Sequence, residues 1–475
     1  MRARNQPFYN GRAMKRVWLL LTAMGCVCWA QPPINWTQQK TEILKHYREL
    51  IQIDTRAGNE TKAVDYIRRL LEAEGIPAQT FALDPARANL VARLKGSGTK
   101  RPLLILAHTD VVGVQPEKWP VDPFSASLKD GYVWGRGSLD DKPVLTADLM
   151  VMLLLKRNQI RLDRDVIFLA ESGEEADTAG VGINFMVQQH YDAIDAEYSL
   201  TEGGNAIIED GRVFSVNIGT AEKVPARVRL VATGTSGHGS VPRMDNALIH
   251  LGAAVEKVGR WRTPMRLNDT TRTYFEKLAT ISTPEKAARY NALLNPATAD
   301  AAQRYLAQHE PGAYSMLRTS VVPTMLKAGV GANVIPSEAE ATLDIRALPD
   351  ENIQNFYTEM AKVIDDPQVK IEPLPMTRPF SPASRLDSEM YRVLEQTSKR
   401  MYPGATVLPS MSTGASDKAQ LRAKGQQSYG IGPAGTRDDI TNYGAHSDVE
   451  RLAEPSIYTF VEFVWGAVTG VAAAR

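Results

Sequence analysis

The sequence predicts an α/β protein in which a mostly parallel sheet forms the larger domain, with a smaller α+β domain inserted into it. Short apolar segments alternate with helical segments over the first half of the chain, as in parallel α/β folds. A strand–helix–strand–strand–helix–strand order follows, and the alternating pattern resumes near residue 380. The 475 residues are enough for two domains with large cores.

The N-terminus is typical of a secretory signal over residues 1–30. An apolar run, VWLLLTAMGCVCW, follows a basic stretch without acids, and Cys28 and Ala30 are small residues ahead of a cut before Gln31. We therefore expect export, with a periplasmic or secreted product cleaved near Ala30. A lipoprotein at Cys26 is the weaker alternative, and a membrane anchor is disfavoured because the run is short.

The composition of the remaining chain restricts its partners and its stabilisation. Both cysteines, Cys26 and Cys28, lie in the signal, so the mature chain has no disulfide. The net charge of +1 includes five basic residues of the signal, and removing them leaves a slightly acidic chain without a basic stripe. Nucleic acid is therefore not expected as a partner.

The first part of the larger domain, 31–220, which we expect to be catalytic because of the residues described below, begins with two helical segments over 36–75, separated by a loop and ended by Gly75. Four apolar segments predict buried strands: NLVARLKG, PLLILAHTDVV, DVIFLAESG and AEYSLTEGG. The helical segments between them are KPVLTADLMVMLLLKRN and VGINFMVQQHY. In such a sheet, ligands bind beyond the carboxyl ends of the strands.

The inserted domain is expected over 221–376, as a ferredoxin-like lid or dimerisation domain. Its strands are KVPARVRLVATG, a segment near 316–327, ATLDIRAL and VKIEPL, and its helices are DNALIHLGAAVEKVGRW and ENIQNFYTEMAKVI. A further helical insertion is expected over about 262–315. Residues 377–475 then complete the catalytic domain.

Residues capable of metal chemistry follow the apolar segments at the expected ligand-binding ends. They are His108 and Asp110 after LLILA, Asp140 and Asp141 in GRGSLDDK, Glu174 and Glu175 after VIFLAESG, Glu202 in YSLTEGG, and His446 in YGAHSD. Two histidines and several carboxylates suit a hydrolytic site that holds two divalent ions.

Each of these residues also has a simpler structural interpretation. His108 and Asp110 share one face of a strand, so Asp110 can fix the tautomer of a ligand His108, or His108 can be an ordinary buried histidine. One of Asp140 and Asp141 can bridge two cations or cap the following helix. Of the Glu174–Glu175 pair, one can be a ligand and the other a general base, or both can begin a solvated helix.

Glu202 and His446 are candidate ligands on loops, and their alternatives are an exposed acid and a surface histidine. In the inserted domain, His238 lies in the Gly-flanked GHGS loop. Asn333 and Arg346 offer an amide and a fixed cation that suit a substrate carboxylate, or they make ordinary strand-end contacts.

Together these motifs resemble the di-zinc metallopeptidase and amidohydrolase superfamily of glutamate carboxypeptidase, aminoacylase and acetylornithine deacetylase. The resemblance covers nearly all of the chain after the signal. The long insertion, GRGSLDDK and Glu202-Gly203-Gly204 are similar to the vacuolar carboxypeptidase and N-acyl-amino-acid hydrolase branch.

The resemblance implies two Zn²⁺ ions per chain, for which Co²⁺ or Mn²⁺ can substitute. Their ligands would be His108, Asp140 as the bridge, Glu175, Glu202 and His446. Glu174 would be the general base, with Asp110 supporting His108. His238 would stabilise the oxyanion, often from the partner subunit of a homodimer, and Asn333 and Arg346 would hold the substrate carboxylate.

The chain departs from the family pattern at three places. Thr201 stands before Glu202, so Glu202 is the only ligand available there. The usual Gly-Gly-Thr-Asp-x-Arg is Gly-Ala-Ser-Asp-Lys-Ala at 414–419, without the arginine, although Lys418 and Arg422 lie nearby. Gly-His-Gly-Ser replaces Gly-His-Ser-Ser around His238.

We therefore predict a carboxypeptidase-like exopeptidase that hydrolyses an amide bond next to a free carboxylate, with a small peptide or N-acyl amino acid as substrate. An N-acyl-amino-acid deacylase or a dipeptidase is the enzymatic alternative. A non-catalytic extracytoplasmic binding protein on the same fold would have lost some of these ligands, and all are present.

Overall fold

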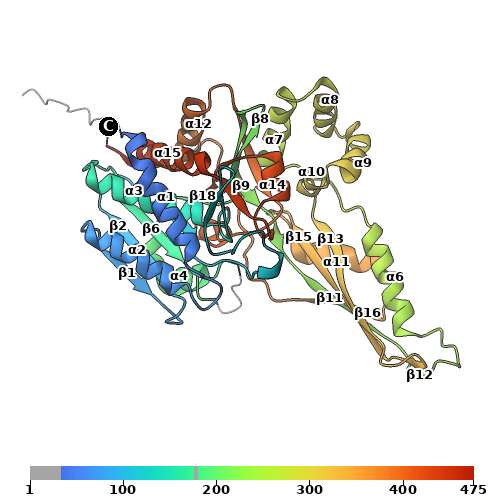
Figure 1. The fold of residues 1–475 in the computed structure, drawn as a ribbon. Helices are drawn as coiled ribbons and strands as arrows, with labels where there is room; N and C mark the ends of the chain where they lie inside the picture. The colour runs from blue at the N-terminus through green and yellow to red at the C-terminus, as the bar shows by residue number, and fades with distance from the viewer. Residues whose placement is uncertain (1–33, 176–179, 475) are drawn as a thin grey trace, which may run out of the picture. The chain divides into compact units, whose positions relative to one another are not determined.

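The computed structural model describes residues 34–175 and 180–474, so the signal predicted at 1–30 lies outside the described residues. From Trp36 onward the chain forms one unit of contacting elements (Figure 1). None of the helices in these ranges combines the length and the apolar character needed to span a membrane.

The large sheet has ten strands in the order β1-β2-β6-β3-β7-β18-β9-β8-β19, with β17 paired to β9. The four strands β6, β3, β7 and β18 are parallel, whereas β1, β2 and the β8–β9 hairpin add antiparallel pairs. The strands are β1 Ala78–Phe81, β2 Asn89–Leu94, β3 Leu103–His108, β6 Val166–Glu171, β7 Tyr198–Thr201, β8 Asn205–Glu209, β9 Arg212–Glu222, β17 Thr406–Ser412, β18 Gln427–Gly430 and β19 Ala434–Thr436. The predicted α/β class is confirmed.

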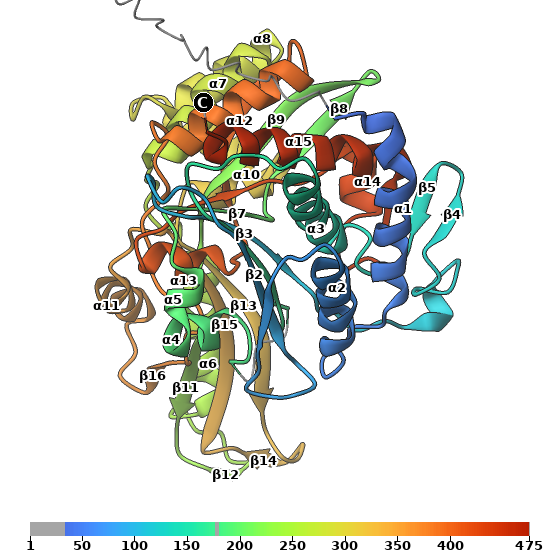
Figure 2. The ribbon, with the colours of Figure 1, turned by 90° about the vertical axis from the view of Figure 1, so that its left-hand side faces the viewer.

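Helices cover both faces of this sheet, as Figure 2 shows. One face carries α1 Trp36–Gln52, α2 Thr61–Ala73, α3 Lys142–Arg157 and α15 Glu454–Ala472, and the other carries α4 Ile183–Gln189, α5 Tyr191–Ile194 and α13 Lys418–Ala423. Helix α3 is buried from Lys142 to Leu155 because it lies between strand β3 and helices α1 and α15. Burial on all sides explains why its sequence is apolar all round. Helix α12, Glu389–Met401, packs on α15.

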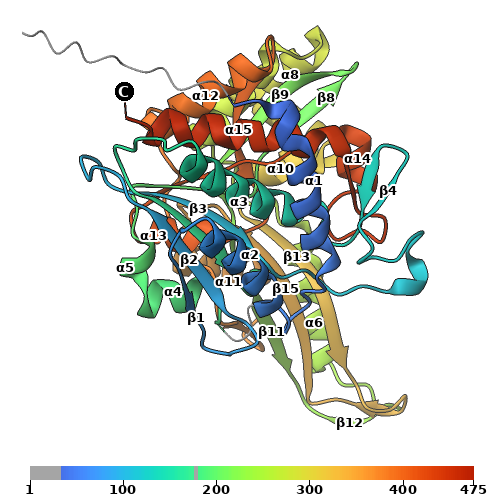
Figure 3. The same ribbon diagram turned by 60° about the vertical axis from the view of Figure 1, so that its left-hand side comes forward.

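The smaller sheet has the order β16-β11-β15-β13, with β10 also paired to β15, and every pair is antiparallel. Its elements are β10 Val224–Pro225, β11 Val228–Thr233, α6 Ala247–Arg260, β13 Ser320–Ala328, β15 Glu338–Ala347, α11 Ile353–Ile364 and β16 Val369–Pro373. Along β15, alternate residues are buried in one core with α6 and α11. This is the predicted ferredoxin-like order, and Figure 3 shows α6 beside β13 and β15.

The helical insertion consists of α7 Asp269–Thr280, α8 Pro284–Leu293, α9 Ala299–His309 and α10 Pro311–Met316. It interrupts the smaller domain in sequence, but α7 packs against β17 of the large sheet. Met316 joins Ala221 and Met411 in a small apolar cluster at the same place. The insertion therefore covers one end of the large sheet, which its position in the sequence did not indicate.

Two small sheets were not predicted. In the first, β4 Ser127–Lys129, β5 Tyr132–Trp134 and β20 Arg451–Ala453 pair side by side. This sheet fixes the end of the loop that carries His446. In the second, β12 Gly237–His238 pairs with β14 Val334–Ile335. Helix α14, Arg437–Asn442, lies just before the His446 loop.

Candidate metal centre

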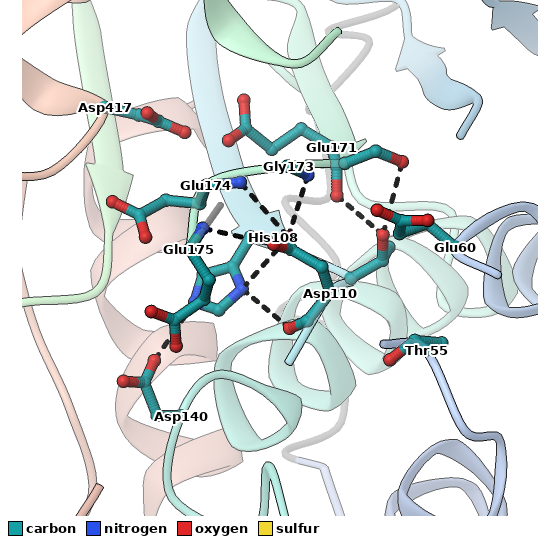
Figure 4. A network of polar contacts seen from close by, with 12 residues as sticks. Thr55, Glu60, His108, Asp110, Asp140, Glu171, Gly173, Glu174, Glu175 and Asp417 are labelled. Carbon is teal, nitrogen blue, oxygen red and sulfur yellow. Dashed lines mark hydrogen bonds and ion pairs between the residues drawn. The ribbon is translucent and has the colours of Figure 1, made fainter. Parts of the chain in front are cut away.

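The carboxyl ends of the central strands bring the predicted metal ligands together, as Figure 4 shows for most of them. His108 ends β3, Glu174 and Glu175 follow β6, and Glu202 follows β7. Asp140 precedes α3, and the peptide bond between it and Asp141 is cis. Helix α3 begins directly after Asp141, whose side chain makes no capping hydrogen bond.

His108 lies at the middle of the cluster. One ligand atom from each of His108, Asp140 and Glu175 fits within 4.8 Å of the others, and the same holds for His108, Glu174 and Glu202. Nε2 of His108 lies 3.0 Å from Oδ1 of Asp140. These are two overlapping groups of candidate metal-ligand atoms that share one histidine.

His446 completes the cluster from a loop near the C-terminal end of the chain. Its Nε2 lies 2.7 Å from Oε1 of Glu175 and 3.3 Å from Oδ2 of Asp140. Its backbone φ is +66°, an uncommon conformation for a residue other than glycine. Asp140 and Glu175 also belong to one of the two groups around His108, so His446 joins that group from a separate loop.

Asp110 orients both the histidine and the following loop. Nδ1 of His108 lies 3.0 Å from the backbone oxygen of Asp110 and 3.5 Å from its carboxylate. That carboxylate accepts hydrogen bonds from the backbone N–H groups of Gly173, Glu174 and Glu175, at 2.9, 3.1 and 3.1 Å. The ring of His108 is thus oriented mainly by the backbone carbonyl of Asp110. The side chain of Asp110 instead holds the backbone of Glu174 and Glu175 in place (Figure 4).

Burial or close charges raise the pKa values of Glu174, His446 and His108. Burial raises the pKa of Glu174 to about 8, the charge of Glu202 adds to this shift, and Arg378 opposes it. Hydrogen bonds to Asp140 and Glu175 raise the pKa of His446 to about 10. Burial acts to lower the pKa of His108, but its bonds to Asp110 and Asp140 outweigh burial and raise it. Several buried carboxylates this close together repel one another, and a bound cation would offset that repulsion.

Two buried residues that sequence reasoning missed hold the Asp140 segment. The guanidinium of Arg136 donates to Glu450 at 2.6 Å, and both side chains are almost fully buried. Oε1 of Glu450 accepts from the backbone N–H groups of Leu139 and Asp140, at 2.7 and 3.2 Å. Glu450 follows His446 by four residues, and that spacing was the only signal for it in the sequence.

A third missed residue, Arg378, reaches the candidate base from the segment after β16. It donates to Oε1 of Glu174 at 2.8 Å and pairs with Asp417 through its other nitrogen. All three side chains are nearly buried. Arg378 is therefore the cation nearest to Glu174 among the ion pairs of the described residues.

The two cations near the missing arginine of the 414–419 motif do not face the centre as substitutes for it. Lys418 is buried and donates to the backbone oxygen of Glu202 at 2.9 Å. Arg422 is buried and donates to Ser384 and Ser428, at 3.0 and 2.9 Å. Both stabilise the strand ends beneath the site.

The residues predicted in the smaller domain lie at opposite ends of its sheet. Arg346 pairs with Pro225 on β10, just after β9 leaves the large sheet. His238 pairs with Val334 on the small β12–β14 ribbon, beyond the end of β15 that starts at Glu338. Along strand β15, the eight residue steps from Glu338 to Arg346 span about 27 Å.

Asn333 lies beside the His238 segment and not beside Arg346. Its backbone oxygen accepts from the N–H of Gly239 at 2.7 Å. The ring of His238 is exposed, and its Nδ1 accepts from the backbone N–H of Ser240 at 3.1 Å and lies 2.7 Å from the Ser240 hydroxyl. Asn333 and Arg346 therefore lie far apart in the smaller domain, although the sequence predicted that both hold the substrate carboxylate.

Comparison with known proteins is consistent with this geometry. The family model described as peptidase family M20/M25/M40 matches residues 104–469. The "N-fatty-acyl-amino acid synthase/hydrolase PM20D1" of Xenopus tropicalis is 28% identical over 374 residues, covering 76% of this chain and 71% of that protein.

Solved structures have the same fold. The M20 family metallo-carboxypeptidase Sso-CP2 from Sulfolobus solfataricus superposes with a TM-score of 0.66 at 18% identity, covering 90% of this chain and 99% of the other. A dinuclear metal-binding M20 peptidase from Bacillus subtilis gives 0.60 at 16% identity, with 92% and 98% covered. The family model spans most of the chain and includes every predicted ligand. The chain therefore belongs to peptidase family M20/M25/M40, which confirms the metal-dependent amide hydrolase predicted from its sequence.

Proposed function

We propose that this enzyme hydrolyses an amide bond next to a free carboxylate, in the manner of a carboxypeptidase, with two Zn²⁺ ions per chain. The observation that carries the proposal is the convergence of two histidines and four carboxylates at one edge of the sheet, with Glu174 next to the metal-binding atoms.

The donor set fits zinc, which binds imidazole nitrogens and carboxylate oxygens. His108 and Glu202 would hold one ion, Glu175 and His446 the other, and Asp140 would bridge them, since its two oxygens already contact His108 and His446 separately. Co²⁺ or Mn²⁺ would satisfy the same donors. When bound, the metal pair supplies an acidified water and polarises the scissile carbonyl.

Glu174 is assigned as the general base. Its carboxylate adjoins His108 and Glu202 but is also held by Arg378, so it stays beside the metal ligands and remains free to take a proton. It accepts the proton of the attacking water and passes it to the leaving amine. Arg346, at the end of the smaller sheet next to β10, is assigned to the substrate carboxylate.

The second candidate is an N-acyl-amino-acid deacylase, which the similarity to the Xenopus hydrolase favours. A dipeptidase activity would use the same centre. A panel of C-terminally free peptides, dipeptides and N-acyl amino acids separates these activities by their kcat/KM values.

The base assignment is tested with Glu174→Ala and the matched variant Glu276→Ala, which changes an acid on α7. We expect Glu174→Ala to bind metal as the wild type does, by elemental analysis, and to lose about 10²–10⁴-fold in kcat. Glu276→Ala should retain both the metal content and the kcat of the wild type. Full metal content with unchanged turnover in Glu174→Ala would refute the role of Glu174.

We further propose that His238 and Asn333 serve the active site of a second copy in a homodimer. The tip that carries them is far along the smaller sheet from Arg346, and α6 and β13 leave apolar side chains exposed, among them Ile249, Met325 and Leu326. Exposed apolar surface of this kind is typical of a protein interface.

A mixing experiment tests this arrangement. If His238 acts across the interface, co-refolded His238→Ala and Glu174→Ala chains form hybrid dimers with one intact site, so an equal mixture should recover about a quarter of wild-type activity. Recovery near zero, or a monomer in sedimentation at working concentration, would show that His238 does not act in a partner.

Export is proposed from the N-terminal sequence alone. N-terminal sequencing of the protein recovered outside the cytoplasm of an expressing bacterium should begin at Gln31. Retention of the full chain in the cytoplasm would contradict it.

A further inference from the structure

The buried ion pair between Arg136 and Glu450 joins two segments that each lead to a predicted metal ligand. Arg136 lies just after strand β5, and Glu450 lies just before strand β20. These two strands pair antiparallel, so the two residues lie side by side at the end of the small sheet. From this point one segment runs four residues forward to Asp140, and the other runs four residues back to His446.

The ion pair contacts the backbone of both segments. Nη1 of Arg136 donates to Oε2 of Glu450 at 2.6 Å, and Oε1 of Glu450 accepts from the N–H groups of Leu139 and Asp140 at 2.7 and 3.2 Å. Nη2 of Arg136 donates to the backbone oxygen of His446 at 3.4 Å. One guanidinium and one carboxylate therefore connect the backbone of Asp140 to that of His446.

The surroundings of the pair keep it dry and fixed. Arg136 is 2% exposed and Glu450 is fully buried. The ring of Trp119 covers the guanidinium, with its centre 5.2 Å from Cζ of Arg136. Tyr47, which is buried on α1, donates to the backbone oxygen of Ser138 in the segment that leads to Asp140. A pair with so little water around it has one well-defined geometry, which it can impose on the segments that it contacts.

His446 has the greater need of such a support. Its φ of +66° is uncommon for a residue other than glycine, and such a conformation persists only where the surroundings enforce it. Its side chain is 51% exposed, so burial does little to hold the ring in place. The contact of its carbonyl with the buried Arg136 is therefore a fixed point next to an exposed side chain.

The two metal ions assigned above would depend on the ion pair to different degrees. The ion of Glu175 and His446 has two of its three protein ligands, Asp140 and His446, on segments that the pair contacts. The ion of His108 and Glu202 shares only Asp140 with these segments, because His108 ends β3 and Glu202 follows β7. Loss of the pair should therefore weaken the first ion more than the second.

We propose that Arg136 and Glu450 are positioning residues that set the affinity for the metal ion held by Glu175 and His446. The proposal rests on the two-metal function assigned above and adds the residues that support one of its two sites. Neither side chain is itself a ligand, since a guanidinium offers no lone pair and both oxygens of Glu450 already accept hydrogen bonds.

The test measures zinc binding to the full-length protein by equilibrium competition with a chelating indicator. The main variant is Arg136→Met/Glu450→Gln, which removes both charges together, because removal of one leaves the other buried and unpaired. The amide oxygen of the new glutamine can still accept from Leu139 and Asp140. The wild type should bind two ions, and the variant should bind one of them about 10–100-fold more weakly while the affinity for the other changes less than about threefold.

His446→Ala identifies the ion that is affected. It removes a ligand of that ion, so it should weaken the same binding step. In a His446→Ala background, Arg136→Met/Glu450→Gln should weaken this step little further, because the pair acts through a side chain that is no longer present. A general structural defect would instead add its full effect in both backgrounds.

Arg164→Met is the matched control. Arg164 is a buried arginine that pairs with Glu197 and Glu389, and it precedes β6 at the end of the sheet opposite to the metal centre. Its loss should lower the melting temperature and leave both zinc affinities unchanged. Arg136→Lys keeps the charge but replaces the planar fork by a single ammonium, so it should weaken the same ion by less, and it decides the test if the double variant does not fold.

Two results would overturn the positioning role. They are wild-type affinity for both ions in folded variants, and equal weakening of both ions. Failure of the underlying function gives a different result, because the wild type itself then binds no zinc or shows no hydrolysis when it is loaded with zinc.

Discussion

The ion pair between Arg378 and Glu174 gives the sharpest test of how the base is held. In Arg378→Met the side chain keeps its apolar length but loses the charge that contacts Glu174 at 2.8 Å and pairs with Asp417. Burial and Glu202 then raise the pKa of Glu174 without the opposing effect of Arg378. The base becomes harder to keep ionised at neutral pH.

The size of the effect follows from the geometry. Two unit charges about 4 Å apart attract by about 4 kcal/mol at an effective dielectric constant of about 20. Because Arg378 shares its charge between two carboxylates, we assign about half of this energy, about 2 kcal/mol, to Glu174. That corresponds to an increase of about 1.5 in its pKa, and to an approximately thirtyfold loss of kcat/KM on the acid side of the profile.

The assay is the pH dependence of kcat/KM for the zinc-loaded enzyme on one good substrate. The acid limb should move upward by about 1.5 pH units in Arg378→Met and return most of the way in Arg378→Lys, which restores the charge. Arg385→Met is the control, since Arg385 forms an exposed pair with Asp387 in the same connecting segment, and its profile should match the wild type.

Two results would refute the reasoning about Arg378. One is an unchanged acid limb in Arg378→Met, which would mean that Glu174 does not depend on this charge. The other is an equal loss at every pH with normal metal content, because a purely structural defect does not move a pKa.

Three further outcomes are expected. Burial lowers the pKa of Lys223 from 10.5 to about 7, and the charges of Arg346 and Arg318 add to this shift. Between these two pH values the unfolded chain therefore keeps a proton on Lys223 that the folded chain has lost. Stability should rise with pH from about 7 to 10.5, and Lys223→Met should reduce the slope of denaturant-derived unfolding free energy by about 1.4 kcal/mol per pH unit; an unchanged slope would contradict the low pKa. Dialysis against a chelator should abolish activity and zinc should restore it, measured by turnover and elemental analysis; activity in a metal-free preparation would exclude the proposed centre. Gly432→Ala should lower the melting temperature by several degrees through its clash with the backbone of Gly204, whereas Gly113→Ala, where a Cβ meets nothing within 4 Å, should not.

The strand ends of the catalytic sheet could be predicted from the sequence because each is a local pattern. An apolar run followed by an acid or histidine marks both a buried strand and its carboxyl end, and a parallel sheet gathers such ends at one edge. His108, Glu174 and Glu202 came together for this reason. The order of elements in the smaller domain was predictable in the same way, since each helix and strand has its own periodicity.

The supporting contacts could not be predicted, because their partners are far apart in the chain and carry no pattern of their own. Arg378 lies 204 residues from Glu174, and Arg136 lies 314 residues from Glu450. The packing of the helical insertion on β17 depends likewise on which apolar faces meet. The local sequence determines which face of a helix is apolar. It does not determine which sheet that apolar face packs against.

The separation of Arg346 from His238 leads to one more conclusion about the smaller domain. Arg346 lies on β15 of the five-stranded sheet, whereas His238 lies on the separate β12–β14 ribbon beyond the Glu338 end of β15, and β15 alone spans about 27 Å from Glu338 to Arg346. Closing the domain onto its own metal centre through the Arg346 end leaves the His238 end outside that centre. We therefore propose that a single chain provides the carboxylate anchor to itself and the oxyanion donor to a second copy. Hybrid dimers are therefore the decisive experiment, since they distinguish a His238 that acts at its own centre from one that acts at the centre of a partner.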